Sequence, residues 1–155
     1  MKKIVIINGH PHKSSFCFAL SSAYKKGAVN SGAAIKEIVI SDLEFNPNLT
    51  FGYQKRMELE PDLLKAWEAI QWADHLVWIH PVWWGGLPAI TKGFIDRLFL
   101  PGMAFKYREN SLWWDQLLKG KTAHKVSYVG IIKTSDEKQR VQWLKKIQKA
   151  GQRQK

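Results

Sequence analysis

The sequence contains a single cysteine, Cys17, and this excludes several kinds of site. One thiol cannot form an intramolecular disulfide or supply a local cluster of cysteine metal ligands. The sequence also has no carboxylate pair placed for acid–base catalysis, no zinc-ligand spacing and no Ser-His-Asp order, so we assign no metal ligand. A lone thiol is compatible with a reducing compartment, and we expect a cytoplasmic protein.

Long apolar runs are absent as well. No run approaches the length that spans a bilayer, so we expect no transmembrane segment. The first apolar run, residues 4–7, ends at Asn8-Gly9-His10, too early for a secretory signal peptide. Hydrophobic residues make up 45% of the 155 residues. This fits one domain spanning 1–155 with a core that is large enough to be stable without disulfides or metal ions.

Acidic residues are few: 13 Asp and Glu stand against 24 Lys and Arg, for a net charge of +11. Such an excess raises the question of nucleic-acid or anionic-membrane binding. The basic residues are densest from Lys119 to Lys155, on or after an amphipathic helical pattern, and stacking aromatics are not interleaved with them. We interpret the charge as a solvated helix face and tail and expect no nucleic-acid partner. Binding to an anionic surface is the alternative that charge alone supports.

What the sequence does contain is a regular alternation of strand and helix patterns. Runs rich in β-branched and apolar residues predict strands at 3–8, 34–40, 75–80 and 124–132. Helical spacing predicts helices at 16–27, 61–72 and 88–98, and a last helix capped at 135–137 with Val141, Trp143, Leu144 and Ile147 facing inward. The βαβαβ order predicts a parallel sheet with right-handed crossovers and helices on both faces.

The loop after the first strand is a candidate phosphate site. It runs from Gly9 to Ser15, and Ser14 or Ser15 can cap the following helix. The unpaired N–H groups and the dipole of a helix N-terminus stabilise a phosphate, and Lys13 would add a donor. Helix caps of this kind are common, so the spacing leaves both phosphate binding and simple capping open. His10 is either a donor to a ligand or a histidine of the helix-entry turn.

The stretch His80-Pro81-Val82-Trp83-Trp84-Gly85-Gly86 is the second candidate, because it directly follows the third strand. In open α/β sheets ligands bind at the carboxyl ends of strands. Adjacent residues of an extended chain point to opposite sides, so we expect one of Trp83 and Trp84 to touch a ligand and the other to join the core. We expect His80 to pack.

Other aromatic residues and the thiol are assigned more modest roles. We expect Trp113 and Trp114 to pack, whereas Phe105 and Tyr107 can line a substrate or a partner-subunit surface. A helix start can lower the pKa of a thiol, but the apolar neighbours of Cys17 favour inert packing.

Three stretches carry a resemblance to a known family: residues 4–16 (IVIINGHPHKSSF), Phe45-Asn46-Pro47, and above all residues 72–114 (WADHLVWIHPVWWGGLPAITKGFIDRLFLPGMAFKYRENSLWW). The chain resembles the flavodoxin-like NAD(P)H:quinone oxidoreductases of the DT-diaphorase and modulator-of-drug-activity-B group. This implies an α/β three-layer sandwich with sheet order 2-1-3-4-5 and FMN or FAD at the switch point between the first and third strands. It also implies hydride transfer from NAD(P)H through the flavin to a quinone, and a homodimer.

The resemblance also implies site residues. The flavin phosphate matches the first loop, at His10, Ser14, Ser15, Phe16 and Cys17. The isoalloxazine ring matches the later loop, at Pro81, Val82, Trp83, Trp84 and Gly85. Apolar and backbone contacts suit a flat ring system, and N–H groups near its pyrimidine edge stabilise the reduced anion.

The chain departs from the family between residues 119–123 and 124–126. There the family carries a fourth strand, a further flavin loop and a helix, whereas here a turn leads directly into the last strand. A gap would expose two sheet edges, so we expect residues 122–132 to lie beside the third strand in a sheet of about four strands. The missing loop normally supplies the catalytic Tyr and His, so we assign no catalytic side chain. A catalytically weakened or non-catalytic flavodoxin-like binding or regulatory protein is the alternative function.

Overall fold

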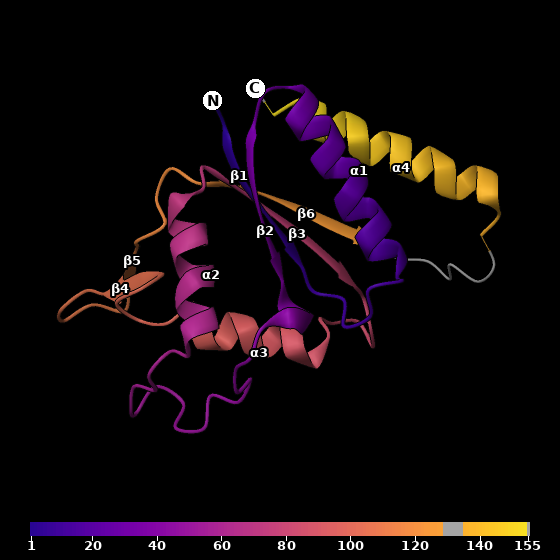
Figure 1. Ribbon diagram of the computed structural model, residues 1–155. Coiled ribbons are helices and arrows are strands. Elements are labelled where there is room, and N and C mark those ends of the chain that lie inside the picture. Colours follow the sequence, from indigo (N-terminus) through magenta and orange to yellow (C-terminus); the bar gives the residue numbers. More distant parts are fainter. Residues whose placement is uncertain (129–134, 155) are drawn as a thin grey trace.

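The middle layer of the protein is a parallel sheet of four strands, as seen in a computed structural model that describes residues 1–128 and 135–154 (Figure 1). The strands are β1 (Lys3–Asn8), β2 (Ala34–Val39), β3 (His75–Pro81) and β6 (Thr122–Tyr128), in the order β2-β1-β3-β6. The predicted second strand ends at Val39 because Ile40 begins a short 3-10 helix, η1 (Ile40–Asp42). Residues 129–132 of the predicted last strand lie outside the described residues. The predicted flavodoxin-like α/β sandwich is confirmed.

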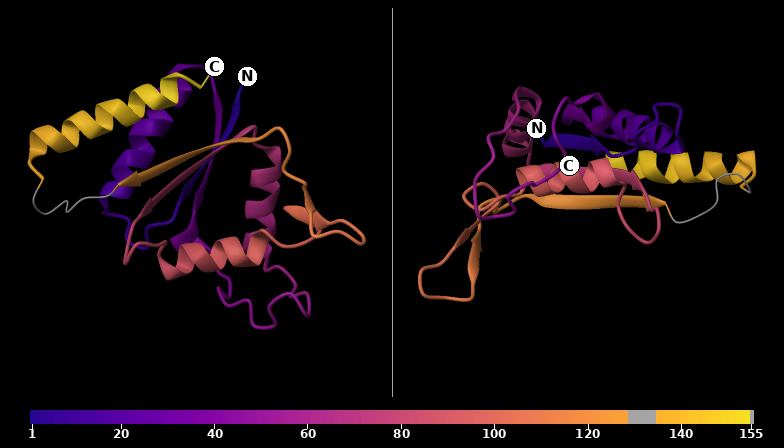
Figure 2. Two further views of the ribbon diagram at one scale, coloured as in Figure 1. Left: turned by 180° about the vertical axis from the view of Figure 1, so that it is seen from behind. Right: turned by 90° about the horizontal axis from the view of Figure 1, so that it is seen from below.

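Helices cover both faces of the sheet (Figures 1 and 2). Helices α1 (Phe16–Asn30) and α4 (Glu137–Gln152) pack on one face, and α2 (Pro61–Trp72) and α3 (Ala89–Leu98) pack on the other. Alternate residues of β1 divide between the two layers, because successive strand side chains point to opposite faces. Ile4 and Ile6 join the core beneath α1, whereas Val5 and Ile7 join the core beneath α2 and α3. The part of the chain that is described has no helix with the length and apolarity to cross a membrane.

Strand β6 pairs directly with β3, from His75 opposite Thr122 to Pro81 opposite Tyr128. This confirms the prediction that the last strand takes the position beside the third. At the start of the pair, His75 Nδ1 lies 2.6 Å from Thr122 Oγ1, and the imidazole is buried. A side-chain bond therefore joins the two strands where β6 enters the sheet.

The buried imidazole makes the stability of the protein sensitive to acid. Burial, and then the nearby charges of His124 and Lys2, lower the pKa of His75 below its ordinary value of 6.5. The folded state therefore binds a proton less readily than the unfolded state. The stability that the neutral His75 imidazole contributes is complete above pH 6.5 and is lost as the pH falls through the lowered pKa. We expect the free energy of unfolding, measured with urea at pH 7.5, 6.5 and 5.5, to fall with acidification.

The variant His75→Gln tests this expectation, because it removes the titrating group. Its unfolding free energy should depend less on pH than that of the wild type. Equal slopes in the wild type and His75→Gln would assign the pH dependence to other groups.

Helix α4 starts at the predicted cap and turns the expected face inward, except at Val141. The Asp136 side chain accepts a hydrogen bond of 2.7 Å from the Gln139 N–H, and the Gln139 side chain bonds back to the Asp136 N–H. Leu144 and Ile147 pack against the core as predicted, but Val141 is 42% exposed. Phe16, the first residue of α1, stacks edge-on with Trp143 at 6.0 Å. Val141 precedes the part of α4 that faces α1, and the prediction for it was wrong.

Helices α1 and α4 approach each other backbone to backbone through two glycines. A Cβ atom added at Gly27 would overlap the carbonyl oxygen of Gln148, and one added at Gly151 would overlap that of Tyr24. Close packing of this kind excludes any side chain at either position. The pair of glycines therefore fixes how α4 lies on the sheet.

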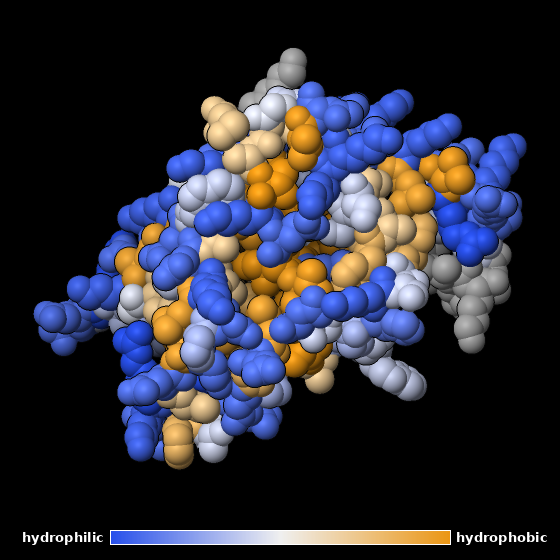
Figure 3. All heavy atoms as spheres, in the orientation of Figure 1, coloured by the Kyte–Doolittle hydropathy of each residue, from blue (hydrophilic) through white to orange (hydrophobic). Residues whose placement is uncertain are grey.

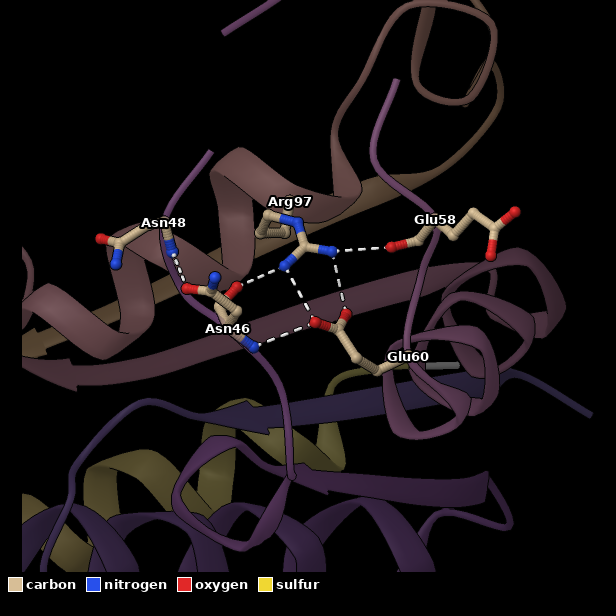
Figure 4. Close-up of polar contacts among 5 residues, drawn as sticks. All are labelled: Asn46, Asn48, Glu58, Glu60 and Arg97. Atoms are coloured by element: carbon tan, nitrogen blue, oxygen red, sulfur yellow. Dashed lines mark hydrogen bonds and ion pairs between the residues drawn. The ribbon is translucent and has the colours of Figure 1, made fainter. Parts of the chain in front are cut away.

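A buried arginine of α3 holds the segment between β2 and α2 in place (Figure 4). Arg97 is fully buried and pairs with both carboxylate oxygens of Glu60, at 2.9 and 3.1 Å. Its other donors reach the carbonyl oxygens of Asn46 and, at 2.9 Å, Glu58. Burial raises the pKa of Glu60, but hydrogen bonds from Arg97 and from the Asn46 N–H outweigh it and leave the pKa below its ordinary value.

Candidate functional site

The loop after β1 is fixed by hydrogen bonds that its own residues make. The Gly9 N–H donates to the Ile79 carbonyl oxygen of β3 at 2.8 Å. The His12 N–H donates to His10 Nδ1 at 2.9 Å, and the Ser14 N–H donates to His12 Nδ1 at 3.4 Å. Because each Nδ1 accepts, the neutral form of each imidazole carries its proton on Nε2. The loop thus presents two imidazole N–H donors in addition to its backbone.

Ser15 occupies the N-cap position of α1, but its hydroxyl does not cap the helix. Its Oγ is buried and has no hydrogen-bond partner among the described residues, and the same holds for Asn8 Nδ2 at the end of β1. Buried polar atoms without partners are costly, and each one calls for an explanation. A bound anion at the N-terminus of α1 would supply one, so the simple capping interpretation does not account for Ser15.

At the next two predicted flavin-contact positions, Phe16 and Cys17, the side chains pack on the core. Cys17 lies in the core beneath α1, and burial raises the pKa of its thiol to about 11. The thiol is therefore protonated and inert, as predicted. Phe16 packs on the same core and contacts Trp143 of α4. Both residues stand in the first turn of α1, at the N-terminal end of the helix.

The loop after β3 closes in a tight reverse turn. Trp83 and Gly86 exchange two backbone hydrogen bonds, of 3.0 and 2.9 Å. The residues between them, Trp84 and Gly85, have φ values of 50° and 73°, which is the pattern of a type I′ turn. Both indoles are exposed, Trp83 by 47% and Trp84 completely. The expectation that one of them joins the core was wrong, because the chain reverses at this point and is not extended.

His80, which ends β3 before this turn, packs as predicted. It is 3% exposed, and its Nδ1 lies 2.8 Å from the Pro81 carbonyl oxygen. Since a carbonyl oxygen only accepts, Nδ1 carries the proton in the neutral ring. On the same sheet face, Trp78, His80, Leu87 and Ile95 line a hollow of about 280 Å³.

The two loops meet at the carboxyl ends of β1 and β3. The rings of His10 and Trp83 stack edge-on with centroids 5.7 Å apart, and Thr91 Oγ1 of α3 donates to the Gly9 carbonyl oxygen at 2.8 Å. Burial is the main reason that the pKa of His10 is lowered, and the nearby charge of His12 also lowers it. The structure thus brings the two predicted stretches together. Asn8 and Thr91 were missed, since a strand-end Asn and a helical Thr give no local signal.

A larger hollow lies elsewhere and holds none of the predicted residues. Figure 3 shows apolar atoms gathered near the middle of the face seen in Figure 1, where a cavity of about 570 Å³ opens between β2 and α2. Its apolar lining includes Ile38, Leu43 and Ala66, and Lys36 and Asp62 stand among the charged residues around it. It lies along β2, an edge strand of the sheet.

A hairpin projects from the body of the protein between α3 and β6 (Figures 1 and 2). It is formed by β4 (Phe105–Tyr107) and β5 (Trp114–Gln116), which pair antiparallel. Leu112 is 97% exposed, Trp113 71% and Trp114 55%. The expectation that Trp113 and Trp114 pack was wrong, because the hairpin carries them away from the core. Among the described residues, no group of three or more metal-ligating side chains comes together.

The doubly wound sheet with two loops that meet at its switch point defines a class of nucleotide- and flavin-binding folds. The flavodoxin-like fold family matches residues 2–147, and the chain belongs to that family, in agreement with the resemblance to its NAD(P)H:quinone oxidoreductases. The chain is 30% identical over 148 residues to the FMN-dependent NADH:quinone oxidoreductase 1 of Lactococcus lactis, covering 84% of this chain and 68% of that one.

Other relatives match over a smaller share of their length. The chain is 28% identical over 130 residues to NAD(P)H dehydrogenase (quinone) 1 of Cavia porcellus, covering 69% of this chain and 46% of that one. It spans about half the length of several such curated relatives. Among solved structures, Smu.1420 from Streptococcus mutans UA159 superposes with a TM-score of 0.82 at 25% identity, covering 97% of this chain and 98% of that one. An NAD(P)H:quinone oxidoreductase from Methanothermobacter marburgensis shares the fold, with a TM-score of 0.80 at 20% identity and 99% of both chains covered.

Proposed function

We propose that the protein is a flavin-dependent oxidoreductase that passes a hydride from NAD(P)H to a quinone. The observation that carries the proposal is the junction of the two loops, where His10 of the first meets Trp83 of the second. A relative that is 30% identical bears the name FMN-dependent NADH:quinone oxidoreductase, so FMN is the flavin we propose, with FAD as the second flavin to be tested.

The phosphate end of the flavin is proposed to bind at the start of α1. There Phe16 begins the helix, and at its N-terminus lie the Ser14 hydroxyl, the Cys17 N–H and the Ser15 Oγ, which has no partner among the described residues. A phosphate accepts hydrogen bonds from all of these groups and is favoured by the helix dipole. His10 adds its Nε2–H as a donor, because its Nδ1 already accepts the bond from the His12 N–H.

The ring end is proposed to lie on Pro81, Val82, Trp83, Trp84 and Gly85. Trp83 and Trp84 are exposed at the mouth of the site, and a flat aromatic ring gains from covering exposed indole surface. The turn holds the backbone of these residues rigidly, which lowers the entropy lost on binding. When bound, the flavin would supply the redox chemistry, and the protein supplies orientation and electrostatics.

A flavin titration tests this proposal. The purified protein should bind FMN with quenching of flavin fluorescence and a shifted visible spectrum. Ser15→Ala and Trp84→Ala should each weaken binding about tenfold, since each removes one hydrogen bond or one ring contact of roughly 1 to 1.5 kcal/mol. Tyr53→Ala, which removes an exposed aromatic ring outside the proposed site, should bind like the wild type. A protein that stays colourless with both FMN and FAD would refute the proposal.

One observation favours a second candidate, a flavin-binding protein with little or no turnover. Strand β6 occupies the position beside β3, where the family carries a further strand and its flavin loop. The described residues therefore hold no such loop beside the proposed ring site. The two functions separate in one assay, the oxidation of NAD(P)H with a soluble quinone. Turnover well above that of free FMN supports the reductase, and bound FMN without turnover supports the binding protein.

We further propose that the protein acts as a homodimer in the cytoplasm. The exposed Leu112, Trp113 and Trp114 support the dimer, because a projecting apolar surface of this kind is typical of a protein–protein contact. The free, buried thiol of Cys17 supports a reducing compartment. The mass in solution, measured by light scattering, tests the dimer.

A further inference from the structure

We propose that Thr91 is a positioning residue that holds the loop after β1 in its flavin-binding conformation, an inference that rests on the proposed function. Thr91 is the third residue of α3 and is fully buried, although it carries a hydroxyl. That hydroxyl donates to the Gly9 carbonyl oxygen at 2.8 Å. Because α3 directly follows the turn at Trp83 to Gly86, this bond joins the two loops that form the candidate site.

Gly9 is held by two hydrogen bonds and by close contacts with its neighbours. Its N–H donates to the Ile79 carbonyl oxygen, and its own carbonyl accepts from Thr91, both at 2.8 Å. A Cβ atom on Gly9 would collide with Thr91 Oγ1 and lie 2.9 Å from Thr91 Cγ2 and 3.2 Å from His80 Cβ. A larger residue does not fit without movement of the neighbours, so Gly9 and Thr91 form a matched pair.

The position of Gly9 decides where His10 lies. The His10 N–H bonds to Asn8 Oδ1 at 3.1 Å, and its ring meets that of Trp83 at 5.7 Å. A shift of Gly9 would carry His10 away from Trp83 and would displace the residues that lead to the N-terminus of α1. Thr91 therefore acts on the ligand through the loop.

The direction of the Thr91 hydrogen bond argues against a role confined to its own helix. A threonine hydroxyl inside a helix usually bonds back to the carbonyl of the preceding turn. Here it bonds to a residue 82 positions earlier in the chain. Valine has nearly the same shape and would fill the same space, so what the hydroxyl adds is the link to the loop.

Two substitutions at position 91 separate the hydroxyl from the shape. In Thr91→Val the loop loses its tether and the binding-competent fraction falls, so the Kd for FMN should rise about tenfold. Amide hydrogen exchange in a peptide covering residues 8–16 should quicken. Thr91→Ser keeps the hydroxyl and should stay within about threefold of the wild-type Kd. Thr50→Val, which removes an exposed hydroxyl, is the control.

A second pair of variants tests the steric match. Gly9→Ala should weaken FMN binding more than Thr91→Val does, because the added methyl pushes the loop away from α3. Gly9→Ala combined with Thr91→Ala should recover part of that loss, since the shortened side chain makes room for the methyl. A double variant that binds no better than Gly9→Ala would overturn the matched pair.

The outcomes for Thr91 and for the proposed function are distinguishable. If Thr91→Val lowers the melting temperature but changes neither the Kd for FMN nor the exchange of residues 8–16, Thr91 is a packing residue and the inference fails. If the wild type binds neither FMN nor FAD, the proposed function fails. The comparison of hydrogen exchange between the wild type and Thr91→Val then decides alone whether Thr91 holds the loop. Unchanged exchange in Thr91→Val then overturns the inference, and quickened exchange confined to residues 8–16 supports the tether.

Discussion

Replacing Gly27 with alanine should lower the free energy of unfolding by about 3 kcal/mol, although alanine is the better helix former by about 1 kcal/mol. The added Cβ would overlap the Gln148 carbonyl oxygen and lie 2.9 Å from its carbon, both of which belong to the backbone of α4. Backbone atoms cannot rotate out of the way as a side chain does. Relief requires that α4 move off α1, which uncovers Leu20 and Tyr24.

Chemical denaturation measures this loss, and hydrogen exchange locates it. The amides of α4 should exchange faster in Gly27→Ala while those of α2 change little. Ser22→Ala is the matched control, because Ser22 is exposed on the same helix and the substitution adds helix propensity without contact to α4. A stabilised Gly27→Ala would mean that the two helices do not approach as closely as described.

Replacing Arg97 with methionine should cost about 3 kcal/mol, because it breaks a buried ion pair and leaves several acceptors without donors. Glu60 loses both of its bonds to the guanidinium, and the carbonyl oxygens of Asn46 and Glu58 lose theirs. This loss of stability is at the low end for a buried ion pair, because the Glu60 side chain is 30% exposed and water can reach it. Urea denaturation at pH 7 measures the loss.

The pH dependence of this loss identifies its origin. The pKa of Glu60 is depressed below 4.5 in the folded state, so its contribution is complete above pH 4.5 and disappears as the pH falls through the depressed value. The gap between the wild type and Arg97→Met should therefore narrow in acid. Lys92→Met removes the exposed pair with Asp96 on the same helix and should change stability by less than about 0.5 kcal/mol. A similar effect of both substitutions would contradict a special role for Arg97.

The sheet and its helices were largely predictable from the sequence because their signals are local. The β-branched run at 3–8 and the helical spacing at 61–72 each reflect burial of one element against its neighbours. The place of β6 beside β3 was predictable from a different argument, since an unfilled position would leave sheet edges exposed. The local sequence patterns and the need to pair the backbone groups of strand edges together predict the α/β sandwich.

The candidate site was less predictable because its geometry depends on turns and on contacts between distant residues. The expectation for Trp83 and Trp84 assumed an extended chain, whereas Gly85 and Gly86 allow a reversal there. That signal was present in the sequence but was outweighed by the strand before it. Arg97 gave no such signal, because a charged residue in a helix is normally solvated and its partners lie 37 to 51 residues away.

The turn at Trp84 has a consequence for how this sequence can change over time. A bulky residue at φ 50° costs roughly 1 to 2 kcal/mol relative to glycine, and its indole buries nothing within the described chain. Folding alone would thus favour glycine or asparagine at this position. Drift toward either one would make the protein more stable while it removed the surface proposed to hold the flavin ring, so stability and binding oppose each other at position 84.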